Sequence, residues 1–422
     1  MEDILLLVAI TYTVALSIGY LLQRYLRMPW MFTVVIFGMF LSAFGLFTPV
    51  VKSGDFKLLS KLGMLALLYI IGLDLNLKEI KSLGPYIAAG DLFLCFFEGA
   101  MLALLFYFWF PADVSNSFSI ALITGVTFAT VGEIILLAIL AEFDMVNTKF
   151  GQLTLGIGVF DDVVEVSMLA IVAALPAFTM KGKVQGVPDS TMIVLSLLLL
   201  LVLTFGIIKI GDRLKNALGS IHGPPYIPSF LLLLTFFSFT ALGGLIYENL
   251  AAIAAIMGGI VTQEIFPERI LKENRKAINF LGYFFLSPFF FLSLGAKISV
   301  ASILVSPLLI ILIIIVSFGS RVLAATVFFN RLFGVKYSFI MGVGLCAKFS
   351  TSVIAENLLF NSGFISPMLF SAIMTAYITM KPTIVSIYSW GLSTAKREIT
   401  TLFSIESPKS PIKTEKVEVK KN

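Results

Sequence analysis

Apolar runs of about 20 residues recur along almost the whole chain, and they restrict its fold more than any other feature. A helix of about 20 apolar residues spans a bilayer core about 30 Å thick. Polar residues, glycine or proline separate the runs, which cover residues 4–23, 30–48, 58–74, 85–110, 117–140, 151–176, 191–209, 226–246, 248–263, 278–296, 300–329, 337–360 and 367–390. Because no strand-like alternation recurs, a β-barrel is disfavoured. We therefore expect an all-α polytopic membrane protein with about 13 transmembrane helices.

The composition also favours a lipid bilayer as the solvent of this chain. Of its 422 residues, 58% are hydrophobic and only 13% are charged, whereas a soluble domain is about 45–50% apolar and about 25% charged. A disordered chain would need low hydrophobicity and high charge. Cys95 and Cys346 both lie in apolar runs, which argues against a disulfide framework. The single histidine, His222, argues against a histidine-ligated metal site.

The positions of the basic residues predict the orientation. Most of the 30 Lys and Arg residues lie in alternate connections and in the C-terminal segment. The opposite connections hold only Lys52, Lys57, Lys181, Lys183 and Lys297. By the positive-inside rule, the N-terminus is outside and the C-terminus is cytoplasmic. The net charge of +5 then needs no nucleic acid partner, and we expect residues 396–422 to be a short basic tail without a nucleotide-binding domain.

Three carboxylates stand in the middle of one apolar run. Asp161, Asp162 and Glu165 share one broad face of a helix. An ionisable side chain at the centre of a membrane helix costs at least about 2.5–3.5 kcal/mol on insertion scales. A proton or a metal cation would relieve their mutual repulsion, and the two would compete, which is the physics of cation/proton exchange. The alternative is a structural ion pair, and for Glu165 both interpretations stay open.

Two basic residues also lie deep in apolar runs, and we expect them to compensate the carboxylate charge. Arg321 stays charged and needs a permanent counter-ion, and Lys348 is the second candidate. Lys381 lies near an inner helix end, where snorkelling to the cytoplasm and a functional role are both open. Four further acidic residues are interpreted as structural: Asp91, Glu98, Glu248 and Glu356.

Two of the apolar runs carry glycine and hydroxyl residues at mid-depth, which favours interrupted helices. Unwound backbone is tolerated in a membrane where it lines a cavity. The run 117–140 contains Gly125, Thr127, Thr130, Gly132 and Glu133, and the run 337–360 contains Gly342, Gly344, Lys348, Ser350 and Thr351. Paired interrupted segments in corresponding halves indicate an inverted-repeat transporter with its site at the crossing. Glu133 and Ser350 are therefore further candidate site residues.

Several stretches resemble the monovalent cation:proton antiporters, in the thirteen-span branch of bacterial Na+/H+ and K+/H+ exchangers. The most specific match is GVFDDVVEV, which is similar to the paired-carboxylate signature of that branch. LALLYIIGLDLNLKEI, LSPFFFLSLGAKI, RVLAA and VGLCAK resemble further stretches of it. The sequence departs from the family at Lys348-Phe349-Ser350, where Arg-Gly-Glu is common, so the choice between Na+ and K+ stays open.

The resemblance implies a mechanism and an architecture. Asp162 would bind the cation and carry the proton, Asp161 would pair with Arg321 in the proton-loaded state, and Thr130 would lie at the crossing. The antiporter domain would cover 1–395. Its core helices, at about 85–176 and 300–390, would move like an elevator against dimerisation helices at about 1–74 and 191–296 of a homodimer.

We therefore expect an Na+/H+ antiporter of a prokaryotic inner membrane, serving pH homeostasis, with Asp161 and Asp162 as ligands of Na+ or K+. No nucleotide loop, nucleophile arrangement or cofactor motif is evident, so we expect neither an enzyme nor a cofactor. K+/H+ exchange is the nearest alternative. A sodium-coupled organic-anion symporter and a non-transporting membrane subunit are alternatives of other classes. Because arginine is not deprotonated in proteins, we expect Asp161 to stay paired with Arg321 and exchange to be electroneutral. The alternative is that cation binding breaks the pair, both aspartates release protons, and exchange is electrogenic.

Overall fold

The protein is described here by a computed structural model that covers residues 2–26, 28–75, 84–179, 190–219, 226–246, 248–348 and 351–402. All regular elements in these ranges are helices, which confirms the expected all-α fold. Seven of the described helices, or up to eight if the bent pair α10 and α11 is one span, are long and apolar enough to cross a membrane. The count of about 13 spans stays a prediction.

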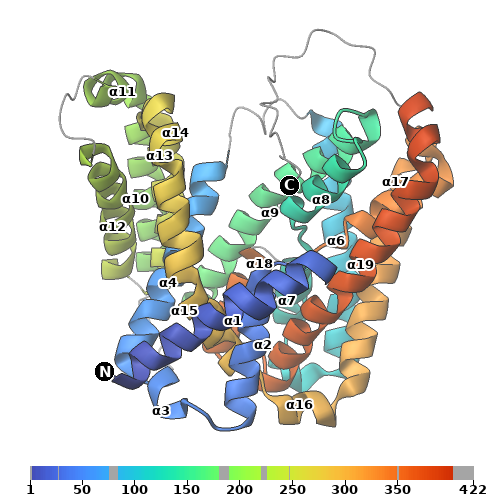
Figure 1. The fold of residues 1–422 in the computed structure, drawn as a ribbon, viewed down its shortest axis with the longest axis horizontal. Helices are drawn as coiled ribbons and strands as arrows, with labels where there is room; N and C mark the ends of the chain where they lie inside the picture. Colours follow the sequence, from blue (N-terminus) through green and yellow to red (C-terminus); the bar gives the residue numbers. More distant parts are fainter. Residues whose placement is uncertain are drawn as a thin grey trace.

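The first set of helices packs together on one side of the molecule (Figure 1). We call it the scaffold group. It contains α1 (Glu2–Leu26), α2 (Trp30–Ala43), α3 (Thr48–Val51), α4 (Gly54–Asp74), α10 (Ser190–Lys209), α11 (Gly211–Gly219), α12 (Ile227–Ile246), α13 (Leu250–Ile265), α14 (Glu268–Asn279), the π-helical η2 (Phe280–Leu286) and α15 (Ser287–Ala296). Its main contacts join α4 to α13 and α15, α12 to α13, and α2 to α15.

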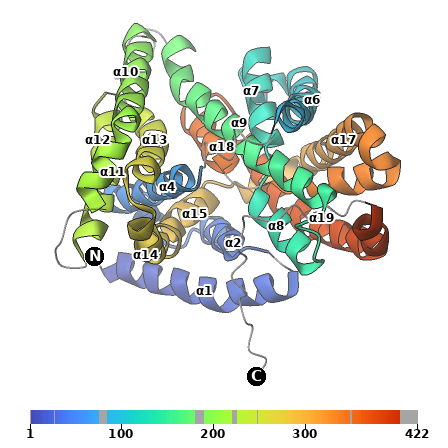
Figure 2. The ribbon, with the colours of Figure 1, turned by 90° about the horizontal axis from the view of Figure 1, so that it is seen from above.

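The second set, the core group, comes from two separate parts of the chain (Figure 2). It contains α6 (Pro85–Trp109), the 3-10 helix η1 (Pro111–Val114), α7 (Phe118–Ala129), α8 (Glu133–Glu142), α9 (Lys149–Thr179), α16 (Val300–Val305), α17 (Pro307–Gly344), α18 (Thr351–Asn361) and α19 (Pro367–Leu402). Here α6 packs on α7, α9 and α17, and α18 packs on α7 and α9. The largest contacts between the two groups join α9 to α10 and α13.

Apolar side chains on the outer surface fit a lipid environment. Leu195, Val202 and Phe205 on α10, and Leu234 and Leu245 on α12, are all well exposed. A helix that presents apolar residues outward as well as inward is typical of a membrane span. The chain is therefore a multi-pass membrane protein, as expected.

Glycine lets backbones approach closely inside each group. In the scaffold, a Cβ at Gly72 would overlap the Ile256 carbonyl oxygen of α13, and one at Gly295 would overlap the backbone of α2. In the core, Gly99 and Gly125 bring α6 and α7 together in the same way. Small residues at helix interfaces drive packing in membranes, because lipid provides little hydrophobic force between helices. Among the described glycines, each such contact with another helix stays within one group.

The break between the runs 300–329 and 337–360 lies where the sequence predicted it. The label α17 covers Pro307 to Gly344, but this range consists of two helices that meet at a kink. Gly334 interrupts it with φ 76°, a left-handed conformation that only glycine adopts readily. The chain turns back there, so the residues after Gly334 form the first half of the interrupted helix that continues in α18.

Candidate ion-binding site

Two interrupted helices meet in the core group. The first breaks between α7 and α8, and the second breaks between the end of α17 and α18. The Gly132 N–H donates a 2.6 Å hydrogen bond to the Ala347 carbonyl oxygen, which joins the two breaks directly. Thr130 lies in the first break, where its hydroxyl donates to the Thr127 carbonyl oxygen over 3.1 Å. The sequence therefore predicted the crossing and the position of Thr130 in it, while a role for Thr130 in ion binding stays a prediction.

Two carboxylates of α9 lie at the N-terminal ends of the broken half-helices. Asp161 accepts a 2.6 Å hydrogen bond from the Val131 N–H, just before α8. One turn later, Glu165 accepts a 3.3 Å bond from the Thr351 N–H, the first residue of α18. A helix N-terminus carries a partial positive charge and free N–H groups, so it stabilises a nearby carboxylate. The spacing of four residues on α9 thus matches the two half-helix ends.

Two lysines lie at the opposite, C-terminal ends of the same half-helices. Lys348 Nζ donates a 2.7 Å hydrogen bond to the carbonyl oxygen of Ala129, the last residue of α7. Lys381 Nζ donates to the Lys348 carbonyl oxygen, in the break that follows α17. The ammonium groups compensate the partial negative charge of the C-terminal carbonyl groups. Lys381 is only 1% exposed, so the snorkelling interpretation of this residue is wrong.

The counter-ion of Arg321 is Glu98 of α6. Arg321 Nε donates a 2.5 Å hydrogen bond to Glu98, and both side chains are fully buried. Lys348 Nζ reaches the same carboxylate over 2.8 Å, and the Ser317 hydroxyl donates to its other oxygen over 2.5 Å. The expected pair between Asp161 and Arg321 is therefore not the pair in this structure. Because α6 packs directly on α17, Glu98 is the carboxylate that reaches Arg321.

The acidic residue Asp91 also belongs to this buried cluster. Neither of its carboxylate oxygens has a hydrogen-bond partner in the described part of the chain, and the same holds for Oδ1 of Asp161. Asp91 lies close enough to Asp161 for the two carboxyl groups to interact electrostatically. Asp91 and Glu98 are seven residues apart, so both face the inside of the bundle from α6. From the sequence we interpreted both residues as structural, although their seven-residue spacing could have indicated a shared position beside the carboxylates of α9.

Asp162 differs from its neighbour in exposure. Asp161 is fully buried, whereas Asp162 is partly exposed. Successive helical residues point about 100° apart, so adjacent aspartates on α9 can differ in this way. Ser350 lies outside the described residues, and for Glu133 the described part is the backbone alone, which begins α8. Their expected roles are therefore untested.

The crossed broken helices and the buried charges define a class of protein. They are the architecture of an inverted-repeat membrane transporter, in which half-helix ends and unwound backbone form the ion site. The comparison with known families agrees, because residues 12–390 match the transmembrane family of sodium/hydrogen exchangers. The chain belongs to this sodium/hydrogen exchanger family.

Individual relatives cover most of the chain at low identity. An Na+/H+ antiporter of Enterococcus hirae is 22% identical over 87% of this chain and 94% of its own length. A high-affinity Na+/H+ antiporter of Synechocystis is 27% identical over 59% of this chain and 51% of its own length. The solved structure of a sodium proton antiporter from Methanocaldococcus jannaschii is similar in fold, with a TM-score of 0.54 and 13% identity, over 94% of this chain and 99% of that one.

Proposed function

We propose that this protein exchanges Na+ for H+ across a membrane. The observation that carries the proposal is the adjacent pair Asp161 and Asp162, on α9 beside the crossing of the two broken helices. Asp161 holds the N-terminal end of one half-helix, while the partly exposed Asp162 is available to an arriving cation. A cation and a proton neutralise the same carboxylates, so the binding of one releases the other.

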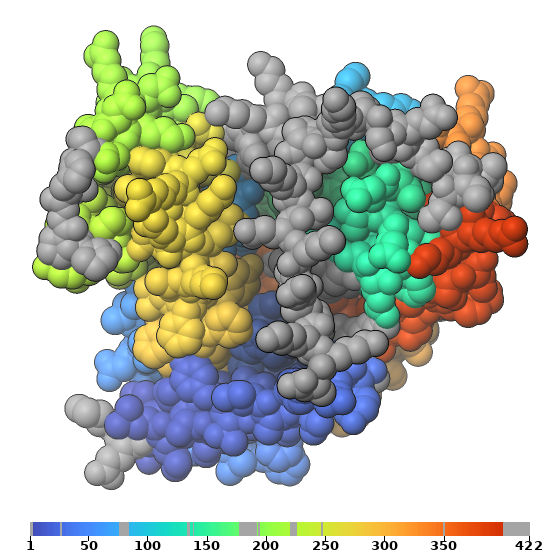
Figure 3. All heavy atoms as spheres, turned by 45° about the horizontal axis from the view of Figure 1, so that its top comes forward, coloured from blue at the N-terminus to red at the C-terminus, as the bar shows by residue number. Residues whose placement is uncertain are grey.

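The two helix groups support alternating access by movement of the core group against the scaffold group. Close glycine contacts join helices within each described group, and no described glycine makes such a contact where α9 meets α10 and α13. Figure 3 shows α14 of the scaffold group (yellow) and α8 of the core group (green) on opposite sides of the face in view. We further propose a homodimer formed by the scaffold group, in a prokaryotic plasma membrane, with the N-terminus outside. Native mass spectrometry tests the dimer, and labelling of cysteines placed near each end of the chain tests the orientation.

K+ is the second candidate for the exchanged cation. A stretch of this chain is 31% identical over 162 residues, 35% of its length, to a chloroplastic K+ efflux antiporter of Arabidopsis thaliana. Carboxylate and hydroxyl oxygens bind both ions. Uptake of labelled Na+ or K+ into everted vesicles, driven by an imposed pH gradient, separates the candidates. Driven uptake of neither ion would contradict cation/proton exchange.

The apparent affinity for the cation should fall as the pH falls. When each bound cation displaces protons from the carboxylates, affinity weakens by up to about tenfold per pH unit for each proton displaced. The measurement is the Na+ concentration for half-maximal exchange in proteoliposomes, taken at intervals from about pH 6 to about pH 9. A half-saturating concentration that stays constant over this range would exclude a shared carboxylate.

We now expect exchange to be electrogenic and not electroneutral. Electrogenic exchange follows if both Asp161 and Asp162 release a proton when the cation binds. Arg321 is paired with Glu98, so it does not hold Asp161 ionised by direct contact. Without that direct pair, cation binding can displace a proton from Asp161 as well as from Asp162. Two protons leaving for each Na+ move one net charge. In proteoliposomes with the membrane potential clamped by K+ and valinomycin, the Na+ distribution should then follow the potential, and a distribution independent of potential would favour electroneutral exchange.

A further inference from the structure

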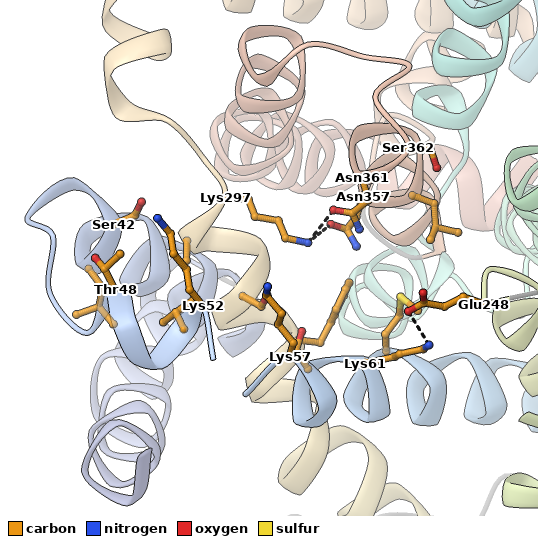
Figure 4. Close-up of a pocket in the computed structure, with 18 of the residues that line it drawn as sticks. Ser42, Thr48, Lys52, Lys57, Lys61, Glu248, Lys297, Asn357, Asn361 and Ser362 are labelled. Atoms are coloured by element: carbon orange, nitrogen blue, oxygen red, sulfur yellow. Dashed lines mark hydrogen bonds and ion pairs between the residues drawn. The ribbon is translucent and has the colours of Figure 1, made fainter. Parts of the chain in front are cut away.

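A basic cavity lies where α4 begins and where α15 and α18 end (Figure 4). Its volume is about 880 Å³, and the residues of the helix crossing do not line it. Four of the described residues that line it are lysines, namely Lys52, Lys57, Lys61 and Lys297. Among the described lining residues, only Glu248 is acidic. The lining therefore carries an excess of positive charge, and none of its lysines belongs to the proposed ion-exchange site.

The ammonium groups of this cavity differ in their partners. Lys61 makes a 2.8 Å ion pair with Glu248, so its charge is balanced. Lys297 donates hydrogen bonds to the neutral amide oxygens of Asn357, over 2.9 Å, and Asn361, over 3.1 Å. Lys52 and Lys57 make no ion pair or side-chain hydrogen bond with the described residues. Three of the four positive charges thus lack an anionic partner in the described part of the chain.

The surroundings of Lys297 destabilise its protonated form. Burial and the nearby charge of Lys57 lower the pKa of Lys297 from its ordinary 10.5 to about 8. Figure 4 shows the two ammonium groups directed into the same space from α4 and from the end of α15. An anion between them would reduce their repulsion and would accept hydrogen bonds from both.

We propose that this cavity binds a phosphate group. Its tetrahedral oxygens would accept hydrogen bonds from Lys57 and Lys297, each of which has donors to spare, and Lys52 adds positive charge to the same cavity. Apolar residues such as Met64, Phe290 and Leu358 stand beside the lysines, so the cavity can hold the glycerol and upper acyl part of an anionic lipid as well as free phosphate. The site lies apart from Asp161 and Asp162, so this inference goes beyond the proposed exchange function.

The test is a binding measurement that does not depend on transport. Purified protein in detergent is titrated with short-chain phosphatidylglycerol, with inorganic phosphate, and with diacylglycerol, which lacks the phosphate, while the melting temperature is followed. We expect at least one phosphate compound to raise the melting temperature, and diacylglycerol to leave it unchanged. Stabilisation by inorganic phosphate would identify the free ion as a ligand, and stabilisation by phosphatidylglycerol alone would identify the lipid headgroup.

Two double variants decide whether the cavity lysines are responsible. Lys52→Gln/Lys57→Gln removes two cavity charges that make no ion pair or side-chain hydrogen bond with the described residues. Half-saturation should then require at least about tenfold more ligand. Arg269→Gln/Lys272→Gln removes two exposed charges from α14 and should bind like the wild type. Equal affinity in the wild type and the cavity variant would overturn the proposal, as would an equal loss in both variants.

The pH dependence provides a separate readout. A phosphodiester keeps the same charge between about pH 7 and about pH 9, whereas Lys297 loses its proton around pH 8. Because the charged form of Lys297 binds the anion, phosphatidylglycerol should bind more weakly at pH 9 than at pH 7. In Lys297→Gln this difference should disappear, and a pH effect that persists unchanged in this variant would contradict a role for Lys297.

Discussion

Replacing Asp162 with asparagine is expected to reduce cation/proton exchange to the level of protein-free vesicles. The amide has nearly the same shape as the carboxyl group, but it neither carries a proton nor supplies negative charge to a cation. Asp162 is partly exposed, so an amide at this position remains accessible to water. The measurement is pH-gradient-driven flux of Na+ and of K+ in proteoliposomes, with the melting temperature as the check that the variant is folded.

Asp212→Asn is the matched control for that experiment. Asp212 is an exposed aspartate on α11, remote from the crossing of the broken helices, and its replacement should leave exchange unchanged. If the Asp162 variant still exchanges Na+ or K+ at the rate of the control, Asp162 is not the ion-binding carboxylate. Asp161 of the same helix would then be the next carboxylate to test.

The second large effect is expected from Glu98→Gln, and it concerns stability. This substitution leaves Arg321 and Lys348 buried without the carboxylate that contacts both. Removing one partner of a buried ion pair costs about 3–5 kcal/mol, because the remaining charge is uncompensated in a low dielectric. We expect a large drop in the melting temperature in detergent, and the double variant Glu98→Gln/Arg321→Gln should recover part of it because one orphaned charge is removed.

An exposed ion pair provides the comparison for Glu98. Glu248 pairs with Lys61, but its side chain is 72% exposed. Water screens such a pair, so Glu248→Gln should change the free energy of unfolding by no more than about 1 kcal/mol. If Glu98→Gln were as stable as Glu248→Gln, the Glu98 carboxylate could not be the main counter-ion of Arg321.

Much of the fold and the centre of the site could be predicted from the sequence, because they depend on local signals. A run of apolar residues of membrane length predicts a span, and glycine with hydroxyl residues at mid-depth predicts a break. Both predicted breaks occur, and they meet through Gly132 and Ala347. The four-residue spacing of Asp161 and Glu165 predicts a shared face of one helix, and the structure places one of these two carboxylates at each break.

The partners of the buried charges could not be predicted in the same way. Glu98 and Arg321 are 223 residues apart in the chain, and their contact depends on how α6 packs against α17. The seven-residue spacing of Asp91 and Glu98 places them on one face of a helix but does not name the opposing helix. Lys381 likewise has a side chain long enough to reach water or the crossing, and only the tertiary fold decides between them.

The glycine contacts described above have a mechanical consequence. Where backbone lies against backbone, few side-chain rotamers can yield, so each helix group is stiff and a displacement at one end of it is transmitted to the other. The boundary that α9 forms with α10 and α13 is built from side chains and is more compliant. A methyl group added at Gly72 or Gly125 should therefore disturb a whole group, whereas a conservative change along that boundary should alter mainly how easily one group slides past the other.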